Sequence, residues 1–261
     1  MDYQTILWAV QDGVATLTLN RPDVLNAFNK QMTDEIQDAL KQAERDKAVR
    51  CLVVTGAGRA FSAGEDLKAH QGGEIQRSIA DAVRTRYNPI ILKMRGLEKP
   101  IIAAINGVAA GAGLSLALAA DLRIMSDKAK LIEAFSRIGL VPDSGSSFFL
   151  PWLVGIGKAA ELCLLAEDVP ADEAWRIGLV NKVVPAGELA SATAAWANKL
   201  AQGPTVAYGL TKRALNRALH AQLHEILEYE MHGQETAGRT ADAQEAIAAF
   251  AEKRTPVFKG E

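Results

Sequence analysis

Two periodicities of hydrophobic positions divide the first 145 residues into alternating strands and helices. Runs of β-branched and other apolar residues predict strands at 14–19, 51–54, 101–105 and 122–125. Between them, segments 29–45 and 78–95 repeat apolar residues every three or four positions, which predicts helices. Because helices of this length join parallel strands as crossovers, the pattern predicts an α/β fold with a parallel sheet.

After about residue 145 the pattern becomes mainly helical. Strand character is retained only near 180–184, and amphipathic periodicity predicts helices at 186–202, 205–217, 219–236 and 240–253. We therefore divide the chain into an α/β core over residues 1–200 and a helical C-terminal region over residues 201–261.

The segment 101–120 is the one candidate for a membrane span, because it contains no charged residue over 20 positions. Polar Asn106 and Ser115 and three glycines interrupt it, however. Its first part has strand character, and residues 114–120 form a helical pattern that is apolar on all sides. We predict a buried strand, turn and helix in the core and no membrane association.

Charge and cysteine content narrow the possible partners and the compartment. The chain has 29 Lys and Arg residues against 31 Asp and Glu residues, a net charge of −2. This balance offers no basic surface to a nucleic acid or to an anionic membrane. Cys51 and Cys163 are too few for a disulfide scaffold, and the N-terminus lacks the pattern of a secretory signal. We expect a cytoplasmic protein.

Two motif-like patterns are better explained by structure than by chemistry. Residues 155–160 match G-x-G-x-x-A, but late in the chain and without an acidic residue about 20 positions on, so a turn before a helix is the better interpretation. His220, His224 and His232 recur along one helical stripe, whose first and last members would lie about 18 Å apart. We predict a solvated helix face and no metal site.

Two glycine-bearing turns follow apolar strands, at 59–67 and 106–113. Small residues in such turns leave main-chain N–H groups accessible, and two N–H donors that converge on one oxygen form an oxyanion hole. From the spacing alone, tight turns in a packed sheet are the better explanation of the same glycines.

Asp143 is the candidate acid–base residue, because it follows the apolar run 138–142. A carboxyl group in apolar surroundings has a raised pKa, which suits proton transfer. The alternative role is an N-cap for a helix that starts near Ser144.

These segments together resemble the crotonase superfamily, the enoyl-CoA hydratases and isomerases. The resemblance extends over nearly the whole chain and is carried by LNRP at 19–22, LNA at 25–27, AFSAGEDL at 60–67, KPIIAAING at 99–107, AADLR at 119–123 and FAEKRTPVFKG at 250–260.

The resemblance implies a spiral of ββα units and a helical C-terminal region that builds trimers or hexamers. It implies an acyl-CoA substrate, with CoA as part of the substrate, and no metal or other cofactor. The thioester oxygen would be held by the main-chain N–H groups of Ala63 and Ala112, or of Gly111 if the register differs by one. The residues implied to lie along the CoA are Leu25, Ala27, Ala60, Asp66 and Leu67, together with Phe258 and Lys259 from the C-terminus of the same or a neighbouring subunit.

The acidic residues depart from the hydratase pattern. The two glutamates of the hydratases align with Ser115 and Phe135, so the machinery that adds water is absent. Asp143 stands where dienoyl-CoA isomerases and aryl-CoA dehalogenases carry an aspartate. The segment 133–143 resembles the branch that isomerises the ring epoxide of phenylacetyl-CoA and moves enoyl-CoA double bonds. Glu133 is a second carboxylate, but out of register with the second acid of the family.

We therefore predict an acyl-CoA isomerase that shifts a double bond or opens a ring epoxide, with Asp143 as the acid–base residue. An enoyl-CoA hydratase, a lyase on the same scaffold, is the alternative enzyme. A non-catalytic relative that binds CoA or RNA is the alternative outside enzymes, and the net charge of −2 disfavours the RNA binder.

Overall fold

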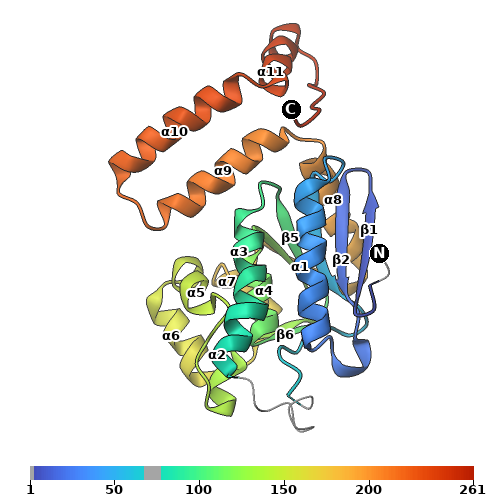
Figure 1. Cartoon of the computed structure of the whole chain (residues 1–261), viewed down its shortest axis with the longest axis vertical. Helices are drawn as coiled ribbons and strands as arrows, with labels where there is room; N and C mark the ends of the chain where they lie inside the picture. Colours follow the sequence, from blue (N-terminus) through green and yellow to red (C-terminus); the bar gives the residue numbers. More distant parts are fainter. Residues whose placement is uncertain (1–2, 68–77) are drawn as a thin grey trace.

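A six-stranded sheet forms the centre of the computed structural model, which describes residues 3–67 and 78–261 (Figure 1). Its strands, in spatial order, are β1 (Ile6–Gln11), β2 (Val14–Leu19), β3 (Cys51–Gly56), β5 (Ile101–Ile105), β7 (Leu122–Ser126) and β10 (Lys182–Val184). All neighbours pair in parallel except β1 and β2, which form an antiparallel hairpin. The predicted parallel sheet and its four predicted strands are confirmed.

A second sheet consists of shorter strands that follow strands of the first. In spatial order it contains β4 (Ala60–Ser62), β6 (Val108–Ala110), β8 (Lys130–Ile132) and β9 (Val169–Pro170). The chain runs from β3 to β4, from β5 to β6 and from β7 to β8, and a helical segment follows each pair. These repeating ββα units confirm the predicted spiral.

Helices cover the sheets and connect successive units. In chain order they are η1 (Pro22–Val24), α1 (Lys30–Arg45), α2 (Ile79–Ala82), η3 (Val83–Tyr87), α3 (Asn88–Gly96), α4 (Ala112–Ala119), η4 (Ala134–Ile138), α5 (Ser146–Val154), α6 (Ile156–Leu165), α7 (Ala171–Arg176), η5 (Ala186–Glu188) and α8 (Leu189–Ala201). The Asn29 side chain caps α1 by accepting a hydrogen bond from the Met32 N–H over 2.8 Å. The helix predicted over 78–95 is instead three segments, with a π-helical turn at η3.

The uncharged segment 101–120 lies inside the core as a strand, a turn and a helix. Every residue of β5 and α4 is buried, and the two elements contact each other. The predicted buried strand and helix are confirmed, and the connection predicted as a turn contains the short strand β6. No helix in the described parts of the chain has the length and apolar character needed to cross a membrane.

Three C-terminal helices, α9 (Thr205–Ala218), α10 (Leu223–Gly238) and α11 (Ala241–Glu252), project from one end of the sheets (Figure 1). The buried Lys212 anchors α9 to the core through an ion pair with Asp121 and a hydrogen bond to the Met94 carbonyl, each 2.8 Å long. The helix predicted over 219–236 begins at Leu223, because Gln222 and Glu225 form a capping box there.

Candidate active site

The two glycine-bearing turns meet at the carboxyl ends of strands β4 and β6, which pair in parallel. Gly64 has a φ of +87°, and a Cβ atom on it would lie 2.8 Å from the Ala110 carbonyl oxygen and 3.4 Å from the Ala112 nitrogen. A Cβ on Gly113 would lie 2.5 Å from the Ser62 carbonyl oxygen. Only glycine permits this contact of the two main chains, so the glycines bring the candidate donor loops together.

Ala112 is the first residue of helix α4, and Gly111 is its N-cap. The N–H of a first helical residue has no acceptor within its own helix, and the positive end of the helix dipole lies beside it. The Ala112 N–H can therefore donate to a negatively charged oxygen.

The prediction for Ala63 is wrong, because its N–H donates to the Leu25 carbonyl over 2.9 Å. Residues 25–28 run alongside this loop, on the edge opposite to β6, and Phe28 pairs in parallel with Glu65. In that pairing the Phe28 N–H donates to the Gly64 carbonyl, and the Asp66 N–H donates to the Phe28 carbonyl. Since successive N–H groups of an extended chain point to opposite edges, the Glu65 N–H is directed toward the β6 edge, where Ala112 lies.

Asp143 lies in the loop before α5 and is half-buried. Burial raises the pKa of its carboxyl group; a hydrogen bond of 2.8 Å from the Ser144 hydroxyl to Oδ1 opposes this effect, and the negative charge of Glu65 adds to it. Ser144 lines a small apolar cavity together with Ala112, Phe28 and Tyr87. Asp143 thus belongs to the same site as the Ala112 donor.

Asp143 does not act as an N-cap, which was the alternative role predicted for it. Helix α5 begins at Ser146 with Gly145 as the N-cap, and no side chain caps it. The carboxyl group of Asp143 is therefore not committed to a helix terminus.

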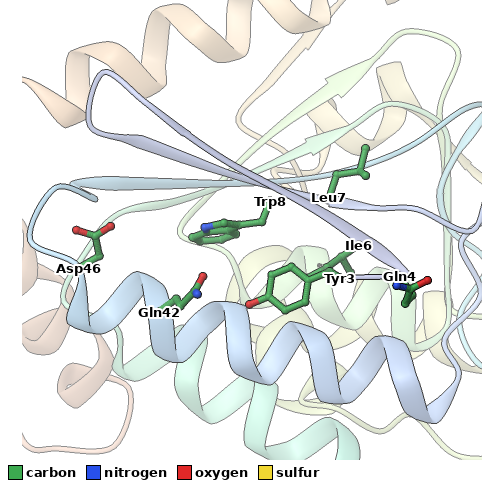
Figure 2. A pocket seen from close by; sticks show the side chains of 7 residues that line it. All are labelled: Tyr3, Gln4, Ile6, Leu7, Trp8, Gln42 and Asp46. Atoms are coloured by element: carbon green, nitrogen blue, oxygen red, sulfur yellow. The ribbon is translucent and has the colours of Figure 1, made fainter. Parts of the chain in front are cut away.

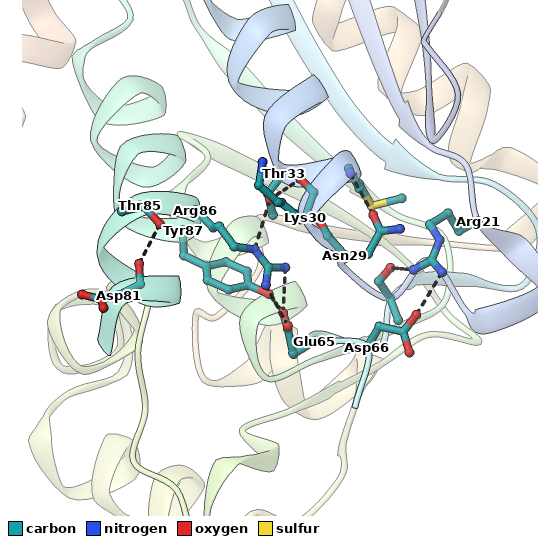
Figure 3. Close-up of polar contacts among 12 residues, drawn as sticks. Arg21, Asn29, Lys30, Thr33, Glu65, Asp66, Asp81, Thr85, Arg86 and Tyr87 are labelled. Carbon is teal, nitrogen blue, oxygen red and sulfur yellow. Dashed lines mark hydrogen bonds and ion pairs between the residues drawn. The ribbon is translucent and has the colours of Figure 1, made fainter. Parts of the chain in front are cut away.

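Glu65 is tied into one wall of the site by polar contacts (Figure 3). Arg86 forms two hydrogen bonds to its carboxylate, of 3.0 and 3.1 Å, and the Tyr87 hydroxyl also donates to it. A bidentate guanidinium–carboxylate pair fixes both partners in orientation. These contacts hold the loop of residues 63–66 against helix η3.

The predicted CoA residues at the N-terminal side come together beside this loop. The Arg21 guanidinium donates to the Ala27 carbonyl over 2.6 Å and to the Asp66 carboxylate over 2.9 Å (Figure 3). Leu25 accepts the hydrogen bond from Ala63, and the buried Ala60 begins β4. Leu67 follows, with 51% of its surface exposed.

Phe258 and Lys259 do not lie near this site within one chain. Arg50 binds the Phe258 carbonyl over 3.1 Å, and the Lys259 N–H donates to Asp242 over 2.6 Å. Arg50 immediately precedes β3, at the end of the sheet opposite to the glycine-bearing turns, and the C-terminus lies beside α11 (Figure 1). A role for these residues in CoA binding is left only as a prediction for a neighbouring subunit.

Ser115 and Phe135, which align with the two glutamates of the hydratases, are not acidic, but the buried carboxyl group of Glu133 lies close by. Ser115 is fully buried, and its hydroxyl lies 3.2 Å from the Gly111 carbonyl oxygen. Phe135 is buried beside Gly111. Glu133 is only 2% exposed; burial raises its pKa to about 7, against a hydrogen bond from Ser146, and the negative charge of Asp143 contributes to the increase. The signal for Glu133 in the sequence is an acid placed directly after the buried strand β8.

Other candidates from the sequence lie outside this site. His220, His224 and His232 are exposed, as predicted, and His220 precedes α10. Among residues 3–67 and 78–261, no cluster of His, Cys, Asp or Glu is arranged to hold a metal ion. A groove between β1 and α1, lined by Tyr3, Trp8 and Gln42 among others, contains none of the predicted site residues (Figure 2).

Comparisons with known proteins give the class of this fold and site. The family model for enoyl-CoA hydratase/isomerase matches residues 9–261. The chain is 43% identical to 1,2-epoxyphenylacetyl-CoA isomerase of Escherichia coli, with 98% of each chain covered. It is 36% identical to trans-2-decenoyl-acyl-carrier-protein isomerase of Streptococcus mutans, with full coverage of both. The structure of an enoyl-CoA hydratase from Bacillus anthracis superimposes with a TM-score of 0.94 at 35% identity, covering 99% of this chain and 100% of that one.

The chain belongs to the enoyl-CoA hydratase/isomerase family. Its fold is the crotonase fold, and an acyl-CoA thioester is the class of substrate consistent with this membership.

Proposed function

We propose that the chain is an acyl-CoA isomerase in which Asp143 moves a proton between carbons of the acyl group. The observation that carries the proposal is a half-buried carboxyl group of raised pKa in the same site as the Ala112 donor, while Ser115 and Phe135 supply no acid. A single base that removes a proton and returns it elsewhere suits a shift of unsaturation.

The charge that develops during this transfer lies on the thioester oxygen. Removing a proton beside a thioester gives an enolate, which preorganised donors stabilise. In the proposal the donors are the N–H groups of Ala112 and Glu65, since the first begins helix α4 and the second is directed toward it. This chemistry requires neither a metal ion nor a cofactor besides the CoA of the substrate.

The binding of CoA is assigned to the residues around Arg21. Leu25, Ala27, Ala60 and Asp66 lie together there, and the exposed Leu67 would border the entrance. The reacting acyl group would lie beside Ala112, next to the apolar side chains around this small cavity, among them Phe28 and Tyr87. The acyl group that we propose is either a ring epoxide, like that named for the E. coli relative, or a linear enoyl chain. Both cysteines are free thiols, consistent with the cytoplasm as the compartment.

A panel of acyl-CoA thioesters tests the reaction. We expect at least one ring-epoxide or 3-enoyl thioester to change its ultraviolet spectrum while its mass stays the same. Crotonyl-CoA should gain water slowly or not at all. Rapid addition of water to crotonyl-CoA, without isomerisation of any thioester, would make the chain a hydratase.

The C-terminal helices predict a homo-oligomer. Large apolar side chains on α10 and α11 are exposed in the single chain, including Leu223 at 74% and Phe250 at 87%. Apolar surfaces of this kind are characteristic of interfaces, and we propose that residues 201–261 build a trimer or a pair of trimers. Light scattering should give about three or six times the mass of the 28.0 kDa chain. A stable monomer at micromolar concentration would contradict this.

A further inference from the structure

A continuous chain of buried polar groups runs behind the proposed site. The Glu133 carboxyl oxygen Oε1 lies 2.9 Å from the Ser146 hydroxyl, which lies 2.8 Å from the Ser115 hydroxyl. The Ser115 hydroxyl lies 3.2 Å from two carbonyl oxygens, those of Gly111 and Asp143. This series of hydrogen-bonded groups therefore ends at two main-chain carbonyls, that of Gly111, which precedes the Ala112 donor, and that of Asp143, the proposed base.

The surroundings of Glu133 disfavour its ionised form. It is packed among β8, η4, α4, α5 and α6, and the titratable groups that face it are Asp143 from the loop before α5 and the Cys163 thiol from α6. The neighbouring cation in sequence, Arg137, points instead to Asp168 over 2.9 Å. No ion pair that the structure describes outside residues 68–77 includes Glu133, and its buried Oε2 has no hydrogen-bond partner. A buried carboxylate without a cation is costly, so the neutral acid is favoured.

The protonation state of Glu133 decides which way the two serines donate. Each hydroxyl has one hydrogen. If Glu133 is ionised, Ser146 donates to it, and Ser115 keeps its 2.8 Å hydrogen bond to Ser146 only by donating to it, which leaves the carbonyls of Gly111 and Asp143 without this donor. If Glu133 is neutral, its O–H donates to Ser146, Ser146 donates to Ser115, and Ser115 donates to one of the two carbonyls.

We propose that Glu133, as a neutral acid, is a positioning residue that holds the Asp143 loop and the first turn of α4 in place through Ser146 and Ser115. The proposal rests on the function proposed above, because it concerns the placement of that base and that donor. Glu133 itself need not touch the substrate. Loss of its proton reverses the serines, and the carbonyl that accepted from the Ser115 hydroxyl keeps only its main-chain hydrogen bond, which comes from the Ser115 N–H at Gly111 and from the Ser146 N–H at Asp143. The base and the donor are then held less firmly, so catalysis declines as Glu133 ionises.

The proposal assigns the rise of activity with pH to one carboxyl group and the fall of activity at higher pH to the other. Asp143 acts as a base, so activity rises with pH as Asp143 ionises. The negative charge of Asp143 raises the pKa of Glu133, so Glu133 stays neutral over a pH range in which Asp143 is already ionised, as in other pairs of unequal acids. Activity then falls as Glu133 ionises, at a pKa of about 7.

The test measures kcat and KM from about pH 5 to pH 9 in three single variants. In Glu133→Gln the amide can donate to Ser146 but cannot ionise, so the variant should retain most of kcat at low pH and lose the decline above neutrality. In Glu133→Leu the serines have no donor, and we expect kcat to fall about 10-fold with KM within about twofold, as for misplaced catalytic groups. Glu167→Gln removes an exposed charge two residues after the end of α6, outside this series of hydrogen bonds, and should keep the wild-type profile.

A second measurement does not depend on activity. When the pKa of an acid is higher in the folded protein than in the unfolded one, the protein loses stability as the pH rises from the unfolded-state pKa to the folded-state pKa. The Tm of the wild type should therefore fall relative to that of Glu133→Gln between about pH 4.5 and pH 7. If no thioester is turned over, the proposed function fails, and this measurement still reports on Glu133.

Two results would overturn the proposal. The first is an alkaline decline in Glu133→Gln with the same midpoint as in the wild type. The second is a difference in Tm between Glu133→Gln and the wild type that stays constant across the pH range.

Discussion

Asp143→Asn should lower kcat by about 10²–10⁴-fold, the range that general base catalysis contributes. The substitution keeps the shape of the side chain, and the amide oxygen can still accept the hydrogen bond from Ser144. The residues around Arg21 are untouched, so the affinity for CoA should change little. Turnover of the isomerised thioester and binding to CoA resin measure the two quantities separately.

Two controls make this prediction specific. Asp12→Asn changes an exposed aspartate with a φ of +50°, a conformation that Asn tolerates, and should leave kcat unchanged. In heavy water, the wild-type product should retain some of the original hydrogen, because one carboxyl group removes and returns it. Full turnover in Asp143→Asn would exclude Asp143 as the base.

Ala112→Pro should lower kcat by about 10²–10³-fold, because it removes a donor N–H worth about 3–4 kcal/mol in comparable oxyanion holes. Proline is well accommodated at the first position of a helix, where the missing N–H has no helical partner. Helix α4 should therefore form, and the loss should appear in kcat for the thioester. Circular dichroism and steady-state kinetics measure the two effects.

The matched control is Ala241→Pro, at the first position of helix α11 and far from the glycine-bearing turns. It tests the cost of a proline at this kind of position without removing the proposed donor. Ala112→Gly keeps the N–H and should lose much less activity than Ala112→Pro. Wild-type turnover in a folded Ala112→Pro protein would mean that another group holds the thioester oxygen.

The periodicity of the chain predicted most of the long strands and none of the three-residue strands that carry the donor loops; it also missed β1, although that strand has six residues. Strands β2, β3, β5 and β7 each have five or six residues, enough for an apolar run to be distinct. Strands β4, β6 and β8 have three residues each, and three residues show no period. The second sheet, which carries the donor loops, was therefore accessible only through the family resemblance.

In the candidate site, too, some residues could be predicted from the sequence and others could not. Asp143 could be proposed because a lone acid after an apolar run is visible in sequence, and Ala112 because the family resemblance implied a donor in the glycine-bearing turn. The assignment of Ala63 failed because the direction of an N–H depends on which chain lies alongside, here residues 25–28. The role of Glu133 depends on Ser115 and Ser146, which are 18 residues before it and 13 residues after it in the chain. Contacts of this kind have no local pattern.

The contact between the two donor loops also bears on how this site can change during evolution. Gly64 and Gly113 set the approach of one main chain to the other, and the proposed donors are peptide N–H groups. Mutation of a neighbouring side chain leaves a peptide N–H in place, so the proposed stabilisation of an enolate would depend little on side-chain identity. The acids, in contrast, are single side chains on separate loops, and each can be gained or lost by one substitution. A lineage with this scaffold can therefore exchange one reaction for another while every intermediate protein retains part of its catalytic power.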